Sequence, residues 1–124
     1  PIVDNLKSLG IRTSLFMDPD PKQIKIAAEI NAHRIELYTE SYAQAFVDKK
    51  DLDLVLKTYQ TAADAANDYG LGLNAGHDLN LYNLPKFCGI KNLLEVSIGH
   101  HLTVDALEMG LEHAIRSYKK ILNP

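Results

Sequence analysis

Two short segments of this 124-residue chain place a histidine directly after a glycine, and each segment follows an apolar run. They are residues 74–78, which contain Gly76, His77 and Asp78, and residues 98–101, which contain Gly99 and His100. An imidazole transfers protons near neutral pH, and a glycine allows backbone to approach a ligand closely. In parallel α/β folds, the loops that follow the strands carry the chemistry. The pattern therefore predicts an enzyme that uses acid–base catalysis.

The elements that must position these loops are four apolar or β-rich runs, at residues 11–17, 34–39, 71–75 and 93–98. Helical patterns separate them. Asp20 can cap a helix that begins at Pro21, which makes the first two runs a βαβ unit. Because each connection is too long for a hairpin and is helical in pattern, we expect the four strands to be parallel.

The remaining segments are assigned in the same way. Residues 40–50 read as a polar loop, and the apolar spacing from Leu52 to Ala66 predicts a helix that Gly70 ends. A short helical segment around residues 81–87 joins the last two strands. Residues 104–122 are expected to be helical with a break at Gly110, and residues 1–10 to be the end of a preceding helix capped by Gly10.

Strands buried on both faces are largely apolar, yet one face of each predicted strand here carries polar groups. These groups are Arg12, Ser14, Glu36, Tyr38, Asn74, Glu95 and Ser97. The other face should pack against helices, with Ile11, Thr13, Leu15, Ile35, Leu37, Leu73, Val96 and Ile98. The predicted fold class is α/β: half of a (β/α)8 TIM barrel, with four parallel βα units and a polar inner face. A complete barrel needs about 250 residues, so residues 1–124 are expected to be a single domain and the carboxy-terminal half-barrel of a larger enzyme.

The polar residues of the inner face divide into structural and functional candidates. Arg12 and Glu95 are expected to pair low in the barrel and neutralise one another. Glu36 lies mid-strand, three residues before the loop, so a barrel would aim it at the floor of the pocket, and we expect it to be functional. Glu40 and Tyr42 read as solvated rim residues.

The two glycine–histidine segments differ in their expected chemistry. His77 lies between Gly76 and Asp78 at the carboxyl end of a strand, and is therefore the catalytic candidate. Gly99 and His100 precede Thr103, a candidate cap for a helix near Val104. Because a helix start beside glycine is an anion site, this second segment predicts phosphate binding. His101 is expected to be structural, and His33 and His113 to lie on the surface.

Composition excludes several classes of function. The chain is 46% hydrophobic and 23% charged, with a formal net charge of −3, so nucleic acid and anionic membrane surfaces are not expected as partners. It has no apolar stretch of membrane-spanning length. Cys88 is the only cysteine, which fits a reducing cytoplasm.

The runs resemble those of the pyridoxine 5′-phosphate synthase family. The resemblance covers almost the whole chain and corresponds to strands five to eight of the family's barrel. It rests on four motifs in order: Ser14-Leu15-Phe16-Met17-Asp18; Ile35-Glu36-Leu37-Tyr38-Thr39 with Tyr42-Ala43; Leu73-Asn74-Ala75-Gly76-His77 with Leu79-Asn80; and Ile98-Gly99-His100.

This resemblance implies a reaction and site residues. The family condenses 3-amino-2-oxopropyl phosphate with 1-deoxy-D-xylulose 5-phosphate to form pyridoxine 5′-phosphate, without a metal or organic cofactor. His77 resembles its proton donor and Glu36 its glutamate that stabilises a charged intermediate. Gly99 and His100 resemble residues that hold the phosphate. Asp78 also falls at a substrate-binding position, but that position is usually glycine in the family.

The resemblance also places the other acid–base groups and the phosphate-gripping arginines in the amino-terminal half, so the isolated chain is expected to be inactive. With two open sheet edges, it is expected to form a homo-oligomer or to pair with that half. Two alternatives from other classes stay open. One is a metal-dependent hydrolase with His77, Asp78, His100 and His101 as ligands, although no HxH or HExxH spacing supports it. The other is a non-catalytic half-barrel that binds phosphate or self-associates.

Overall fold

A four-stranded parallel sheet with the strand order β1-β2-β3-β4 organises the chain. The computed structural model describes residues 2–123. The strands are β1 (Ser14–Met17), β2 (Arg34–Tyr38), β3 (Gly72–Gly76) and β4 (Leu93–Ser97), and an irregularity between Leu73 and Asn74 interrupts the β3–β4 register. The predicted half-barrel of parallel βα units is therefore confirmed.

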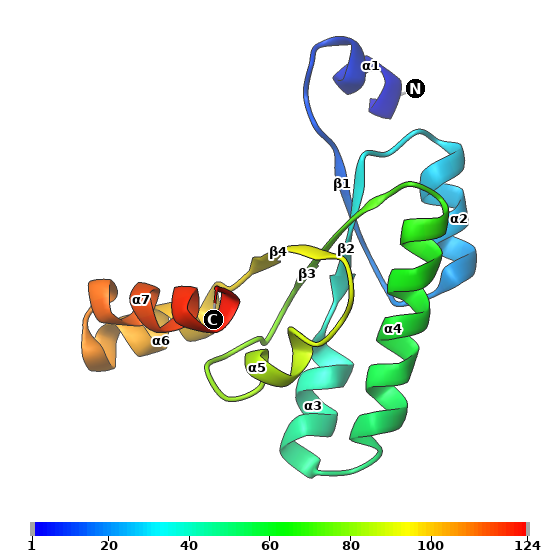
Figure 1. Ribbon diagram of the computed structural model, residues 1–124. Helices are drawn as coiled ribbons and strands as arrows, with labels where there is room; N and C mark the ends of the chain where they lie inside the picture. Colours follow the sequence, from blue (N-terminus) through cyan, green and yellow to red (C-terminus); the bar gives the residue numbers. More distant parts are fainter. Residues whose placement is uncertain (1, 124) are drawn as a thin grey trace.

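The outer face of the sheet is covered by helices, as the sequence predicted. Helices α2 (Pro21–Glu29) and α4 (Leu52–Asp68) pack side by side against it, and α3 (Glu40–Asp48) lies beside the lower part of α4 in Figure 1. The core lies between the sheet and these helices. It is apolar because every second residue of each strand points toward the helices. Its fully buried members include Ile24, Ile35, Leu37, Tyr42, Tyr59, Ala62, Ala66 and Phe87.

The chain ends in a helical hairpin that extends from the β4 edge of the sheet (Figure 1). It consists of α6 (His100–Met109) and α7 (Leu111–Leu122), which pack on each other, and it follows the short helix α5 (Leu84–Phe87) and β4. Tyr118 anchors α7 to the core and donates a hydrogen bond to Asp105 of α6 at 2.6 Å. The predicted break at Gly110 is confirmed, since this residue has a φ of +86° between the two helices.

Local signals account for several helix ends. Asp20 caps α2 by accepting a hydrogen bond from the Lys22 backbone N–H at 2.9 Å. Gly70 has a φ of +72° just after α4, as expected for a residue that ends a helix. Gly10 has the same φ after α1 (Ile2–Ser8), the helix predicted at the start of the chain. Pro1 lies outside the described residues.

Five expectations of local structure were wrong. The segment read as a polar loop contains α3, and Tyr42 within it is fully buried, not a rim residue. It is buried because the first turn of α3 faces α4 and α5. Strand β1 begins at Ser14, which leaves Ile11 47% exposed. His33 is half-buried and accepts a hydrogen bond from the Thr13 backbone N–H at 3.2 Å. Helix α6 begins at His100 with Gly99 as its cap residue, so Thr103 does not cap it.

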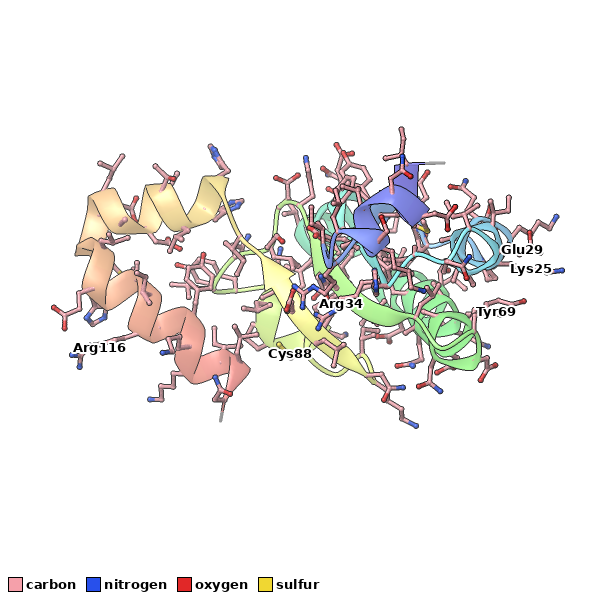
Figure 2. The ribbon with its side chains drawn as sticks, turned by 90° about the horizontal axis from the view of Figure 1, so that it is seen from above. Lys25, Glu29, Arg34, Tyr69, Cys88 and Arg116 are labelled. Atoms are coloured by element: carbon pink, nitrogen blue, oxygen red, sulfur yellow. The ribbon has the colours of Figure 1, made fainter. Side chains whose placement is uncertain are left out.

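The lower part of the inner face holds a polar layer. Glu95 accepts hydrogen bonds from Arg12 at 3.2 Å and pairs with Arg34 at 2.8 Å, so the expected Arg12–Glu95 pair is confirmed. Asn74 joins them by accepting from Arg34 at 3.1 Å and donating to Glu95 at 3.1 Å. Figure 2 shows Arg34 amid the strands, while Arg116 of α7 projects outward. Sequence reasoning missed Arg34. With Arg12 and Arg34 against Glu95, the layer carries one more cation than carboxylate.

Candidate active site

A cleft of about 610 Å³ lies at the carboxyl ends of the strands, on the inner face. Its lining comes from all four strands or the loops that follow them: Phe16, Glu36, His77, Asp78, Ser97, Ile98, Gly99 and His100. The structure thus brings together all five residues that the sequence singled out for catalysis or binding. It does so because parallel strands end at one edge of the sheet.

Glu36 of β2 belongs to the lining of this cleft. Gly76, on the neighbouring strand β3, has no side chain. The Glu36 carboxylate occupies the space that a side chain at residue 76 would fill. A Cβ built on Gly76 would lie 2.5 Å from Glu36 Oε1 and 3.0 Å from Ser97 Cβ. The absence of a side chain at residue 76 therefore lets the carboxylate lie across β3 inside the cleft.

The loop that carries His77 is held by its backbone. Three successive carbonyl groups each accept a hydrogen bond: Gly76 O from the Thr39 N–H at 2.9 Å, His77 O from the Thr39 hydroxyl, and Asp78 O from the Asn83 side-chain amide at 3.0 Å. Both donor residues are buried, at 0% and 1% exposure. Because buried hydrogen bonds are costly to break, this arrangement fixes the loop relative to β2.

Asn83 is itself held in place by its neighbours. Its Oδ1 accepts from the Asn80 N–H at 2.8 Å, and its own N–H donates to Asn80 Oδ1 at 3.0 Å. The buried phenol of Tyr42 donates to Asn83 O at 2.6 Å. Sequence reasoning missed Thr39 and Asn83 as site residues, because their role depends on partners 38 and 5 positions away along the chain.

The imidazole of His77 is contacted on two sides. Its Nδ1 lies 3.0 Å from Asp78 Oδ2. Its ring packs edge-to-face on Tyr38, with ring centroids 4.5 Å apart, and Tyr38 in turn packs on Phe16 at 5.4 Å. The side chain of His77 remains 45% exposed, so it is oriented by neighbours while still open to the cleft.

Tyr38 also links this site to Glu40. Its phenol donates a hydrogen bond to the Glu40 carboxylate, and this bond, with burial and the negative charge of Glu40, raises the pKa of Tyr38 to about 12. The phenol therefore stays protonated at neutral pH. Glu40 is exposed, as the sequence predicted.

The second histidine segment opens helix α6. Gly99 precedes its first turn, and a Cβ built on Gly99 would meet no atom within 4 Å. A helix N-terminus offers backbone N–H groups and a positive dipole end, which suit an anion. His100 borders the same cleft and its ring packs on His101, with centroids 5.2 Å apart. His113 is exposed on α7, as expected.

Two features of the described part of the chain bear on other functions. Among residues 2–123, no group of three His, Cys, Asp or Glu side chains is arranged to hold a metal ion. Over the same residues, no helix combines the length and the apolar character that crossing a membrane requires.

Comparisons with known proteins place this chain in a family. The family model described as pyridoxal phosphate biosynthesis protein PdxJ matches residues 1–124. A pyridoxine 5′-phosphate synthase of Bacteroides fragilis (strain YCH46) is 49% identical over 98% of this chain and 51% of its own length. Synthases of the same name from Porphyromonas gingivalis and Agrobacterium fabrum are 49% and 47% identical, over 95% and 94% of this chain.

The chain spans about half the length of these curated relatives, and the part it matches is their carboxy-terminal half. The predicted resemblance is therefore confirmed along the whole chain, together with the half-barrel fold that it implied. Both results lead to one assignment: the chain belongs to the PdxJ family of pyridoxal phosphate biosynthesis proteins.

Proposed function

We propose that this chain is the carboxy-terminal half of a pyridoxine 5′-phosphate synthase, which condenses 3-amino-2-oxopropyl phosphate with 1-deoxy-D-xylulose 5-phosphate to form pyridoxine 5′-phosphate, with loss of inorganic phosphate and water. The single observation that carries the proposal is the cleft in which Glu36, His77, Gly99 and His100 meet at the carboxyl ends of parallel strands. The names of the relatives supply the product, pyridoxine 5′-phosphate. The two substrates are those that the resemblance to the family implies.

The chemistry of ring closure suits the two catalytic candidates. The reaction passes through imine and enamine stages, which need repeated proton transfers and a negative group near a developing cation. His77 acts as the proton donor, because it lies at the cleft with its ring held in one orientation. Glu36, whose carboxylate lines the cleft, stabilises the cationic intermediate.

The phosphate of the aminoketone substrate binds at the start of α6. Gly99 allows the phosphate to approach the backbone donors there, and His100 adds a polar contact. Asp78 takes part through its main chain, since its carboxylate contacts His77 and would repel a phosphate. No metal or organic cofactor enters this scheme.

The half-barrel needs the other half of a barrel in order to be catalytically active. The open inner face and the edges of β1 and β4 are completed by the amino-terminal half of the barrel or by a second copy of this chain. Small phosphorylated molecules are the proposed substrates. The lone cysteine, Cys88, is compatible with the cytoplasm as the place of the reaction.

The direct test is a completed barrel. The amino-terminal half of the Bacteroides fragilis relative is fused to this chain, and formation of pyridoxine 5′-phosphate from the two substrates is measured, with the intact relative as the reference. The fusion should be active, and this chain alone should be inactive. A folded fusion without activity would refute the proposal and favour the non-catalytic half-barrel, whereas activity of this chain alone would refute the need for a complement.

Association is tested separately by light scattering on the purified chain at micromolar concentration. A dimer or larger oligomer is expected, because two sheet edges and a polar inner face are exposed. A well-folded monomer would contradict self-association. Addition of the amino-terminal half should shift the distribution toward a one-to-one complex.

A further inference from the structure

The backbone of the histidine loop adopts a conformation that L-residues seldom take. His77 has a φ of +96° and Asp78 a φ of +55°. Glycine adopts such angles without steric cost, whereas other residues do so at some cost, and aspartate is among those that tolerate it best. Aspartate is thus compatible with the backbone at residue 78, and what it adds there over glycine is a carboxylate.

The contact of that side chain identifies the role. Asp78 Oδ2 lies 3.0 Å from His77 Nδ1, within hydrogen-bond distance. Among residues 2–123, the imidazole of His77 is the only group with which this carboxylate forms a hydrogen bond or ion pair. A carboxylate accepts only, so the bond requires a proton on Nδ1. In the neutral ring, Nε2 then carries no proton.

The neighbours of the pair fix it in place. The backbone carbonyls of His77 and Asp78 are bonded to buried Thr39 and Asn83, and the Tyr38 ring lies against the imidazole. Because both backbones are held, the carboxylate and the ring meet without either residue having to be ordered at the time of reaction. Such preorganisation is what an orienting contact needs.

We infer that Asp78 is a positioning residue that selects the Nδ1–H tautomer of His77 and leaves Nε2 as the atom that takes up a proton and then donates it to the substrate. This inference rests on the proposed function for the identity of the reaction, but the tautomer itself does not depend on it. It also separates the two functions of Asp78, with the carboxylate serving His77 and the main chain bordering the phosphate.

The first experiment measures the tautomer directly in this chain. The chain carries five histidines, and labelling them with ¹⁵N and ¹³C makes the ring shifts of each one visible. His77→Asn identifies the His77 signals by their loss. At a pH where the ring is neutral, the wild-type His77 should show the Nδ1–H form. In Asp78→Gly and Asp78→Asn the population should move toward the Nε2–H form, which predominates in free imidazole side chains.

Asp78→Gly is the principal variant because glycine suits a φ of +55°, so the loop should keep its fold. Asp64→Asn is the matched control, since Asp64 is an exposed carboxylate that accepts from Gln60 on α4, far from the cleft. The control should leave the His77 signals unchanged. A wild-type His77 in the Nε2–H form, or a His77 tautomer unaffected by Asp78→Gly, would overturn the inference.

The second experiment measures turnover in the completed barrel. Asp78→Gly should lower kcat by about ten- to hundredfold, less than the loss of the acid–base group itself. Its KM for the aminoketone phosphate should stay within a few-fold of wild type, because the main chain is retained. If the wild-type barrel is inactive, the proposed function fails while the tautomer result stands. If the barrel is active and Asp78→Gly retains full kcat, the positioning role fails.

Discussion

The carboxylate of Glu36 lies over the backbone of Gly76, close enough that even a methyl group at residue 76 would come within 2.5 Å of it. This relationship ties the first glycine–histidine segment to the glutamate of the neighbouring strand. The register of β2 and β3 produces it, since Glu36 pairs with Asn74 and the next inward-facing residue of β3 is Gly76.

Gly76→Ala should therefore act through Glu36. The new methyl group displaces the carboxylate and presses on Ser97, so we expect a loss of about 1–3 kcal/mol of stability and a fall in turnover of the completed barrel. A double-mutant cycle with Glu36→Gln tests whether Gly76→Ala lowers turnover by displacing the Glu36 carboxylate. If the turnover losses of the two single variants multiply in the double variant, Gly76 does not act through Glu36.

His77→Asn in the completed barrel should lower turnover by about 10²–10⁴-fold, because general acid–base groups contribute on that scale. Substrate affinity should stay close to normal, which steady-state kinetics and a binding measurement can establish. His113→Asn is the matched control, since His113 is exposed on α7. Full turnover in His77→Asn would contradict the role of His77 as the proton donor.

Gly99→Leu should instead weaken binding of the aminoketone phosphate. A side chain at residue 99 meets no protein atom within 4 Å, so the variant should fold normally and project its side chain where the phosphate is proposed to approach α6. Thermal denaturation should show unchanged stability, and calorimetry should show reduced affinity. Normal phosphate binding would rule out this position as the phosphate site.

Thr39→Val should loosen the His77 loop. It removes the hydroxyl that donates to His77 O and leaves that carbonyl without its partner, at a cost of about 1–3 kcal/mol. Urea denaturation of the chain measures this cost, and turnover of the completed barrel measures its effect on the site. Thr39→Ser keeps the hydroxyl and should behave like wild type. Equal stabilities of the valine and serine variants would contradict the prediction.

Alkaline pH should destabilise the fold through its buried tyrosines. Burial raises the pKa of Tyr42 from 10.0 to about 12. Its contribution to stability is therefore complete below pH 10, the value for the unfolded chain, and is lost as the pH rises toward 12. Burial also raises the pKa of Tyr59.

Urea midpoints measured at intervals from pH 8 to 12 check this dependence. Tyr42→Phe should reduce the loss above pH 10, and at pH 8 it should cost about 1–3 kcal/mol because Asn83 O loses its donor. Tyr82→Phe is the control, since Tyr82 is 82% exposed. The same alkaline loss in Tyr42→Phe as in wild type would show that other groups cause it.

The sequence by itself determined the strand order and the candidate site. Four apolar runs separated by long helical connections permit little other than parallel strands, and parallel strands place their following loops at one edge. The positions of residues along the chain were therefore enough to predict that four of them lie close together: Glu36, His77, Gly99 and His100. The alternation of polar and apolar residues likewise predicted which face of the sheet the helices cover.

The tertiary structure alone decided how those residues are held. The burial of Tyr42 depends on helices α4 and α5, which the local sequence around residues 40–48 does not contain. Thr39 and Asn83 acquire their roles from backbone carbonyls of another segment, and Arg34 from Asn74 and Glu95 on two other strands. Such contacts are fixed by register and packing, since a hydrogen bond depends on where its partner lies in space and not on where it lies in the chain.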